Sequence, residues 1–139
     1  MQQGRAMSLA GPWRFRTDPD CLCDLTPADL GRAADDECAY FLPTYDDGGW
    51  QTIPVPGNWQ QFGHDYNGVA WYRTRFARPE MPQDGVARLR FAAVDYYADV
   101  WLNGYYLGSH EGFFAPFTVD CTPWLMEQNT LVVRVDSPN

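Results

Sequence analysis

The dipeptide Asn103-Gly104, set between two strand-like runs, constrains the fold of this chain more than any other feature. Asn-Gly favours a two-residue β-hairpin turn, because both central residues of that turn need positive φ angles. The run Ala98–Leu102 before it alternates with a period of two, which places successive side chains on opposite faces of a strand. The sequence therefore predicts a hairpin with strands over Ala98–Leu102 and Tyr105–Ser109.

Similar short runs recur along the whole chain, separated by Gly, Pro, Asn and Asp. Alternation places Leu89 and Phe91 inward, with Arg88 and Arg90 outward. By the same pattern, Leu131, Val133 and Val135 face inward and Val132 and Arg134 outward. Short strands without long amphipathic helices are typical of an all-β jelly-roll β-sandwich. The remaining predicted strands are Trp13–Arg16, Gln51–Val55, Ala70–Ala77, Ala87–Val94, Phe114–Val119 and Leu131–Val135.

Two short helices complete the predicted architecture. Thr122-Pro123 combines a capping residue with proline at the first helical position, which predicts a turn over Pro123–Gln128. Thr26-Pro27 gives the same signal for a helix over Pro27–Ala34.

Length and composition narrow the class of protein. A chain of 139 residues, 45% hydrophobic, fits one soluble domain over 1–139. Its net charge of −8 argues against a nucleic-acid or anionic-membrane partner, and no apolar run is long enough to span a membrane. The N-terminus shows no signal peptide, which leaves the location open but favours the cytoplasm.

The four cysteines indicate neither a metal site nor a redox motif. Cys21 and Cys23 flank a single residue, whereas paired zinc ligands are two to four residues apart. A disulfide from either of them to Cys38 is an alternative, but free thiols are the default expectation. Cys121 is expected to be a small core residue. We expect no metal and no cofactor.

Five segments, taken in order, resemble the N-terminal sugar-binding domain of glycoside hydrolase family 2, which includes β-galactosidases and β-glucuronidases. Residues 17–45 match poorly and form an insert. The matching segments are Ser8–Phe15, Asp46–Trp59 with its Val55-Pro56 and Trp59, Gly68–Phe76 with Trp71-Tyr72-Arg73, Ala98–Gly112, and Asn129–Asp136 with Arg134-Val135-Asp136.

The resemblance implies a galactose-binding-like β-sandwich that forms one wall of an active site in a larger enzyme. The partners would be a carbohydrate substrate and the other domains of that enzyme, whose barrel carries the catalytic glutamates. The chain itself would then hydrolyse nothing. Two alternatives stay open: a free-standing carbohydrate-binding module, and a purely structural domain.

The loop His64–Gly68 holds the candidate substrate-binding residues, Asn67 and Asp65. In the family's β-galactosidases, the asparagine that matches Asn67 projects into the sugar subsite. An amide both donates and accepts hydrogen bonds, which suits a sugar hydroxyl. The alternative is an Asn-Gly turn that binds no ligand.

No set of residues in the sequence makes a convincing catalytic centre. Asp35–Glu37 and Asp46-Asp47 are expected to be solvated turns, with Asp46–Gly49 shaping a turn before Trp50. Ser109-His110-Glu111 cannot converge as a triad, because consecutive residues of an extended chain point to opposite faces. We expect these three residues in an exposed loop.

The tryptophans divide into two groups. Trp13, Trp50 and Trp59, together with Tyr72, stand at positions of the family pattern and are expected to be structural. Trp71 and Trp101 alternate with inward-facing neighbours, so we expect both to be partly exposed. Such a patch would be used between domains or in a homo-oligomer.

Overall fold

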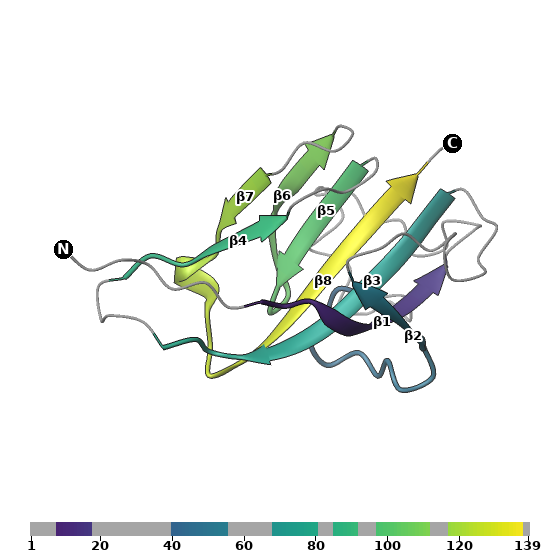
Figure 1. Ribbon diagram of the computed structural model, residues 1–139, viewed down its shortest axis with the longest axis horizontal. Helices are drawn as coiled ribbons and strands as arrows, with labels where there is room; N and C mark the ends of the chain where they lie inside the picture. The colour runs from purple at the N-terminus through teal and green to yellow at the C-terminus, as the bar shows by residue number, and fades with distance from the viewer. Residues whose placement is uncertain are drawn as a thin grey trace.

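The computed structural model describes residues 8–17, 40–55, 68–80, 85–91, 97–111 and 117–137. These residues form strands and one short 3₁₀ helix, η3 (Figure 1). The elements are β1 (Gly11–Thr17), β2 (Gln51–Val55), β3 (Gly68–Ala77), β4 (Arg88–Phe91), β5 (Tyr97–Leu102), β6 (Tyr105–Glu111), β7 (Phe117–Asp120), η3 (Thr122–Trp124) and β8 (Gln128–Ser137).

The strands form a six-stranded sheet in the order β2-β1-β3-β8-β5-β6 and a two-stranded sheet of β4 and β7. Every pairing is antiparallel. The predicted all-β jelly-roll sandwich is therefore confirmed. At one edge, Pro12 of β1 lies opposite Pro54 of β2. Near the other edge, the β5–β6 ladder shifts register between Val100 and Trp101.

The predicted hairpin is present between β5 and β6. Asn103 has a φ of 54° and Gly104 a φ of 89°, as the two-residue turn requires. The Asn103 amide also fixes the turn to its surroundings: Nδ2 donates to the Trp124 carbonyl at 2.7 Å, and Oδ1 accepts from the Thr130 N–H at 2.9 Å. The asparagine thus serves both as a turn former and as a link to β8.

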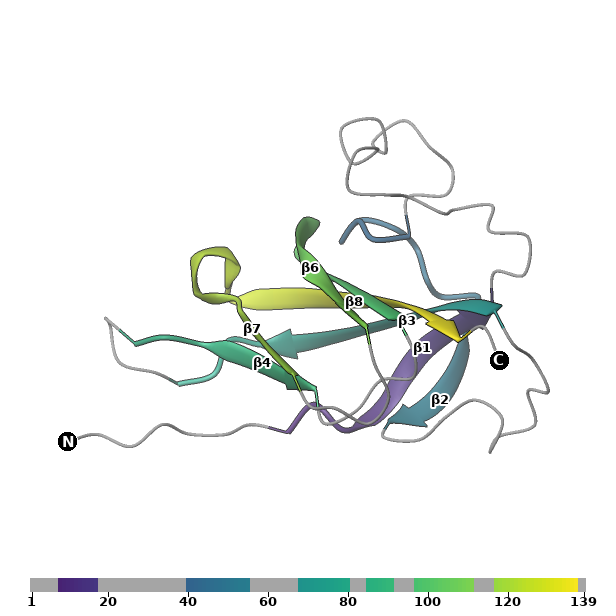
Figure 2. The same ribbon diagram turned by 90° about the horizontal axis from the view of Figure 1, so that it is seen from above.

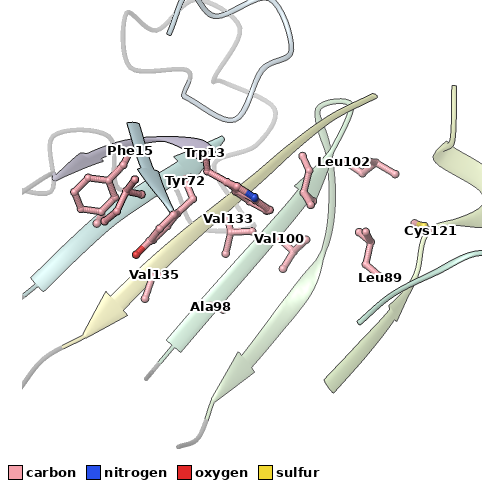
Figure 3. Close-up of a cluster of buried hydrophobic side chains, with 13 residues drawn as sticks. Trp13, Phe15, Tyr72, Leu89, Ala98, Val100, Leu102, Cys121, Val133 and Val135 are labelled. Carbon is pink, nitrogen blue, oxygen red and sulfur yellow. The ribbon is translucent and has the colours of Figure 1, made fainter. Parts of the chain in front are cut away.

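The first of two apolar clusters, the inner core, lies between the two sheets (Figure 3). Its side chains come from alternate positions of the strands, as the sequence predicts for Leu89, Leu131, Val133 and Val135. Cys121 is buried here as expected, and burial raises the pKa of its thiol. The other members are Trp13, Phe15, Ile53, Ala70, Tyr72, Ala98, Val100 and Leu102.

The second cluster, the outer cluster, lies on the opposite face of the six-stranded sheet. The segment Tyr40–Trp50 crosses this face, on the far side of β3 and β8 from β4 and β7 (Figure 2). The outer cluster consists of Tyr40, Phe41, Trp50, Val69, Trp71, Trp101 and Val132.

The prediction that Trp71 and Trp101 are exposed is wrong. Their side chains are 0% and 1% exposed, and their rings stack on each other with centroids 5.4 Å apart. Alternation correctly places them opposite the inner core, but Phe41 stacks on Trp101 and Tyr40 meets Trp71 edge-on. Val132, also predicted to face outward, is buried in the same cluster. Residues of the same chain therefore cover both tryptophans, so these side chains cannot form an interface with another domain or subunit.

The predicted helix over Pro123–Gln128 is also too long. The 3₁₀ turn ends at Trp124, because Leu125 takes an extended conformation and β8 begins at Gln128. The Asn129 side chain favours this early end, since its Oδ1 accepts from the Met126 N–H at 2.8 Å. The helix predicted over Pro27–Ala34 lies outside the described residues. In the described ranges, no helix is long and apolar enough to cross a bilayer.

Candidate functional site

The loop predicted to meet a sugar leads directly into β3. Asn67 and Asp65 lie outside the described residues, but Gly68, the next residue after Asn67, begins β3 and pairs with Ser137 at the end of β8. The loop therefore joins the six-stranded sheet at the end where β8 finishes.

The other strands also begin or end at this end of the sheet. β1 finishes with Thr17 opposite Ala70, and β5 starts with Tyr97 opposite Asp136 (Figure 1). β6 finishes with Glu111, which pairs with Tyr97. Strands that are distant in sequence thus begin or end at the end of the sheet where residue 67 is attached.

As the sequence predicts, Ser109, His110 and Glu111 do not form a triad. They belong to β6 rather than to an exposed loop, and their side chains alternate between its faces. The His110 ring stacks on Phe117 with centroids 4.1 Å apart, and Phe117 stacks in turn on Phe91. The histidine therefore packs between the two sheets.

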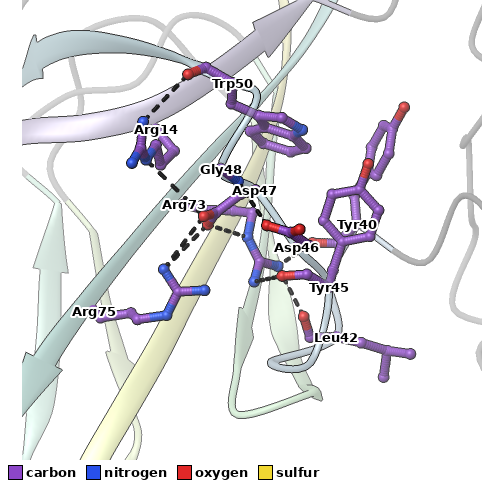
Figure 4. A network of polar contacts seen from close by, with 10 residues as sticks. All are labelled: Arg14, Tyr40, Leu42, Tyr45, Asp46, Asp47, Gly48, Trp50, Arg73 and Arg75. Atoms are coloured by element: carbon purple, nitrogen blue, oxygen red, sulfur yellow. Dashed lines mark hydrogen bonds and ion pairs between the residues drawn. The ribbon is translucent and has the colours of Figure 1, made fainter.

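Asp47 departs most from its predicted role. The expected turn before Trp50 is present, since the Trp50 N–H donates to the Asp47 carbonyl at 3.0 Å. The Asp47 side chain, however, is buried rather than solvated. Its carboxylate accepts a hydrogen bond from Arg73 Nε at 2.8 Å and lies 3.3 Å from Arg75 Nη1 and 4.0 Å from Arg14 Nε (Figure 4).

Arg73 is the centre of this network and is completely buried. Besides binding Asp47, its guanidinium donates to the carbonyl oxygens of Tyr40, Leu42 and Tyr45, at 2.9 Å for Leu42 and 3.2 Å for Tyr45. Burial lowers the pKa of Arg73, and the Asp47 carboxylate opposes that change. The side chain thus ties the segment that covers the outer cluster to β3.

The Asp47 network is structural rather than catalytic. Burial alone raises the pKa of Asp47, but hydrogen bonds and charge from Arg73 and Arg75 hold it below its usual 3.8. A general acid needs a raised pKa, so this carboxylate is unsuited to protonating a leaving group. Sequence reasoning missed the pair because the run Asp46–Gly49 looks like a surface turn. The available signal was Arg73 itself, an arginine within a predicted strand whose alternate residues belong to the core.

Within the described ranges, no group of three His, Cys, Asp or Glu residues could hold a metal ion. Cys21, Cys23, Cys38 and Trp59 lie outside those ranges. The structural roles expected for Trp13, Trp50 and Tyr72 are confirmed by their burial.

A surface hollow of about 440 Å³ lies at the other end of β3. Residues Ser8–Pro12 and Thr74–Glu80 line it. Because β3 runs ten residues from Gly68, the two ends are roughly 30 Å apart. The hollow is therefore separate from the point where the predicted sugar loop joins β3.

Comparisons with known proteins agree with this architecture. A family model described as "Glycosyl hydrolase 2 galactose-binding domain-like" matches residues 60–139. A β-glucuronidase of Canis lupus familiaris is 32% identical and covers 81% of this chain and 17% of its own length. A β-galactosidase of Vibrio cholerae is 28% identical, and the matched region covers 95% of this chain and 14% of the β-galactosidase.

The solved structures give the same result. A β-glucuronidase from Ruminococcus gnavus, in complex with uronic deoxynojirimycin, superposes with a TM-score of 0.74 at 26% identity. The match covers 94% of this chain and 21% of that one. Against the curated relatives, the chain spans between 10% and 17% of their length. The chain belongs to the galactose-binding-like domains of glycoside hydrolase family 2.

Proposed function

We propose that this chain is the N-terminal, sugar-binding-like domain of a longer enzyme that hydrolyses β-galactosides or β-glucuronides. The observation that carries the proposal is the family match over residues 60–139, which includes the loop before β3. The matched relatives are named β-glucuronidase or β-galactosidase and are several times longer than the chain.

Within that enzyme, the loop before β3 would form one wall of the sugar subsite. Asn67 would contribute its amide to a sugar hydroxyl, with Asp65 beside it. The start of β3 supports this role, because Gly68 is held against Ser137 and gives the loop a fixed base. The domain would orient the substrate and leave proton transfer to carboxylates elsewhere in the enzyme.

Two carboxylates of the described residues, Asp47 and Asp99, have structural partners, which supports a non-catalytic role for both. Asp47 is bound by arginines. Asp99 accepts from the Tyr106 hydroxyl at 2.8 Å and lies 3.5 Å from Arg134 Nη1. Both carboxylates thus hold strands or turns in place, and neither offers a free acid facing a second one.

The test compares the 139-residue chain with the protein encoded by its full reading frame, using nitrophenyl β-galactoside and nitrophenyl β-glucuronide. We expect turnover of one substrate by the longer protein and none by the chain. If the longer protein hydrolyses neither while the chain binds free sugars, the binding-module alternative is correct instead.

Asn67→Ala in the longer protein sharpens the test. Losing one sugar hydrogen bond should lower kcat/KM several-fold, corresponding to about 1 kcal/mol. Gln61→Ala, in the same segment but outside the candidate loop, is the control and should leave the kinetics unchanged. Equal kinetics for Asn67→Ala and the parent would remove Asn67 from the site.

A further inference from the structure

Four arginines lie on the face of β1 and β3 that points away from the inner core. On β1, Arg14 and Arg16 alternate with Trp13 and Phe15, which belong to that core. On β3, Arg73 and Arg75 alternate in the same way with Tyr72. We call Arg14, Arg16, Arg73 and Arg75 the arginine strip. It holds four of the ten basic residues of the chain.

Within the part of the chain that the structure describes, the arginine strip carries more positive charge than its ion-pair partners neutralise. Arg14 pairs directly with Arg73 across the ladder, an arrangement of like charges that is unfavourable without a counter-charge. Asp47 is the carboxylate that approaches Arg14, Arg73 and Arg75. Arg16 instead lies over the Tyr40 ring, 5.3 Å from its centroid. Among the described residues, the four guanidinium groups share one ion-paired carboxylate, which leaves three positive charges in excess on a chain of net charge −8.

The surplus charge is on the solvent side. Arg73 is buried and its donors are used by Asp47 and backbone carbonyls. The side chains of Arg14 and Arg75 are 42% and 51% exposed, and Arg16 is exposed as well. Arg14 and Arg75 reach Asp47 only at 4.0 Å and 3.3 Å, so most of their N–H donors remain available to solvent or a ligand.

The exposed arginines start from regularly spaced backbone positions. Arg16, Arg14 and Arg75 occupy successive rows of the sheet, since Arg16 lies opposite Trp71 and Arg14 opposite Arg73. Successive rows on one face are about 7 Å apart. The guanidinium groups of Arg14 and Arg75 both turn toward Asp47, and that of Arg16 lies over Tyr40. Each of the three has the planar fork that binds a carboxylate in a bidentate manner.

We propose that the arginine strip binds an acidic saccharide whose uronate carboxylates lie on Arg14, Arg16 and Arg75. This site extends along β1 and β3 from the end of the sheet where the candidate loop joins, and it would hold an extended, charged part of a substrate. The saccharide class rests on the proposed function; the requirement for carboxylates comes from the strip itself. Three exposed guanidinium groups on one face suit a ligand that carries several carboxylates.

The test uses the 139-residue chain and isothermal titration with tri-galacturonate at low ionic strength. The methyl ester of the same trisaccharide removes the charge but keeps the sugar, and a tri-glutamate peptide keeps the carboxylates but removes the sugar. We expect binding of the trisaccharide, weaker binding of the peptide and none of the ester. Raising the ionic strength from about 0.01 M to about 0.15 M should weaken binding.

Two charge-matched variants locate the site. Arg16→Gln/Arg75→Gln should weaken binding roughly tenfold or more, because two charge-assisted hydrogen bonds are lost. Arg88→Gln/Arg90→Gln removes two exposed arginines from β4 and should change affinity less than about twofold. Near-ultraviolet circular dichroism checks that each variant keeps the fold.

Three results would overturn the proposal. Equal losses in the two variants would mean a general charge effect. Undiminished binding of the ester would mean that the sugar, not the carboxylate, is recognised. Binding of the peptide as tight as that of the trisaccharide would mean that the strip meets acidic protein. None of these results bears on hydrolysis by the longer protein, so the two proposals fail separately.

Discussion

Each face of the six-stranded sheet carries a buried apolar cluster, but the two clusters are covered by different means. The inner core is covered by β4 and β7, which pair with each other and contribute apolar side chains such as Leu89. The outer cluster is covered by Tyr40–Trp50, a segment of turns and bends without strand pairing. That segment is held by Arg73, which binds three of its carbonyl oxygens and the Asp47 carboxylate.

The difference shows what a covering segment needs when it lacks a hydrogen-bonded ladder. Buried carbonyl groups must be satisfied, and a strand does this through its neighbours. In Tyr40–Trp50, one guanidinium with five donors replaces much of that ladder. The outer cluster therefore depends on one ion pair, whereas the inner core depends on many interchangeable apolar contacts.

Arg73→Met should produce the largest effect. It leaves the Asp47 carboxylate buried with only partly exposed partners and removes the donor for three carbonyl groups. We expect a loss of about 3–5 kcal/mol in the free energy of unfolding, measured by urea denaturation.

Arg75→Gln is the matched control, because its side chain is half exposed and its contact with Asp47 is longer. It should lose less than about 1 kcal/mol. Asp47→Leu/Arg73→Met should recover part of the stability lost in the single variant. Equal effects of Arg73→Met and Arg75→Gln would contradict the anchoring role of Arg73.

A pair of valines compares the two clusters directly. Val100 in the inner core and Val132 in the outer cluster are both 0% exposed. Each change to alanine should lower the free energy of unfolding by roughly 1–3 kcal/mol. Only Val132→Ala should alter the near-ultraviolet signal of the stacked Trp71 and Trp101. A matching spectral change in Val100→Ala would mean that the clusters are not independent.

Gly104→Ala tests the contact between the hairpin and the covering segment. Gly104 has a φ of 89°, a left-handed conformation that alanine rarely adopts. The added Cβ would also lie 3.2 Å from Pro43 Cδ. We expect a loss of about 1–2 kcal/mol in chemical denaturation. Gly49→Ala, where a Cβ meets nothing within 4 Å, should be nearly neutral. Comparable losses at both glycines would rule out the conformational explanation.

The smallest expected effect is the pH dependence contributed by Asp47. Burial raises the pKa of Asp47 in the folded state, but Arg73 and Arg75 lower it by more, so the pKa lies below its usual 3.8. The ionised group thus adds stability above pH 3.8, which is lost as the pH falls through the folded pKa. Between about pH 5 and pH 2, wild type should lose more stability than Asp47→Asn. Parallel pH curves for the two proteins would exclude this contribution.

Local sequence signals predicted most of the described fold. Asn103-Gly104 specifies its turn through φ angles that few other residues adopt, and β2 was predicted at its observed bounds. Alternation assigned residues such as Leu89 and Val133 to the correct face. These features depend on near neighbours in the chain, so a single sequence contains the needed information.

What covers the second face could not be predicted in this way. Alternation says which way Trp101 points, but Phe41, sixty residues earlier, decides whether it meets solvent. The partner of Asp47 is likewise remote in sequence, at Arg73. For the sugar loop, the sequence names Asn67 and Asp65, and these residues remain predictions.

The two border strands of the large sheet bear on how this protein avoids aggregation. Pro12 and Pro54 face each other, and since neither has an N–H, they form a pair without hydrogen bonds. The nitrogen of Pro54 therefore points outward, where a foreign strand would seek a donor. At the other border, the register shift in the β5–β6 ladder increases the local twist, so β6 offers a foreign strand a less flat edge. Intermolecular strand addition, the usual route to fibrils, is thus discouraged at both borders.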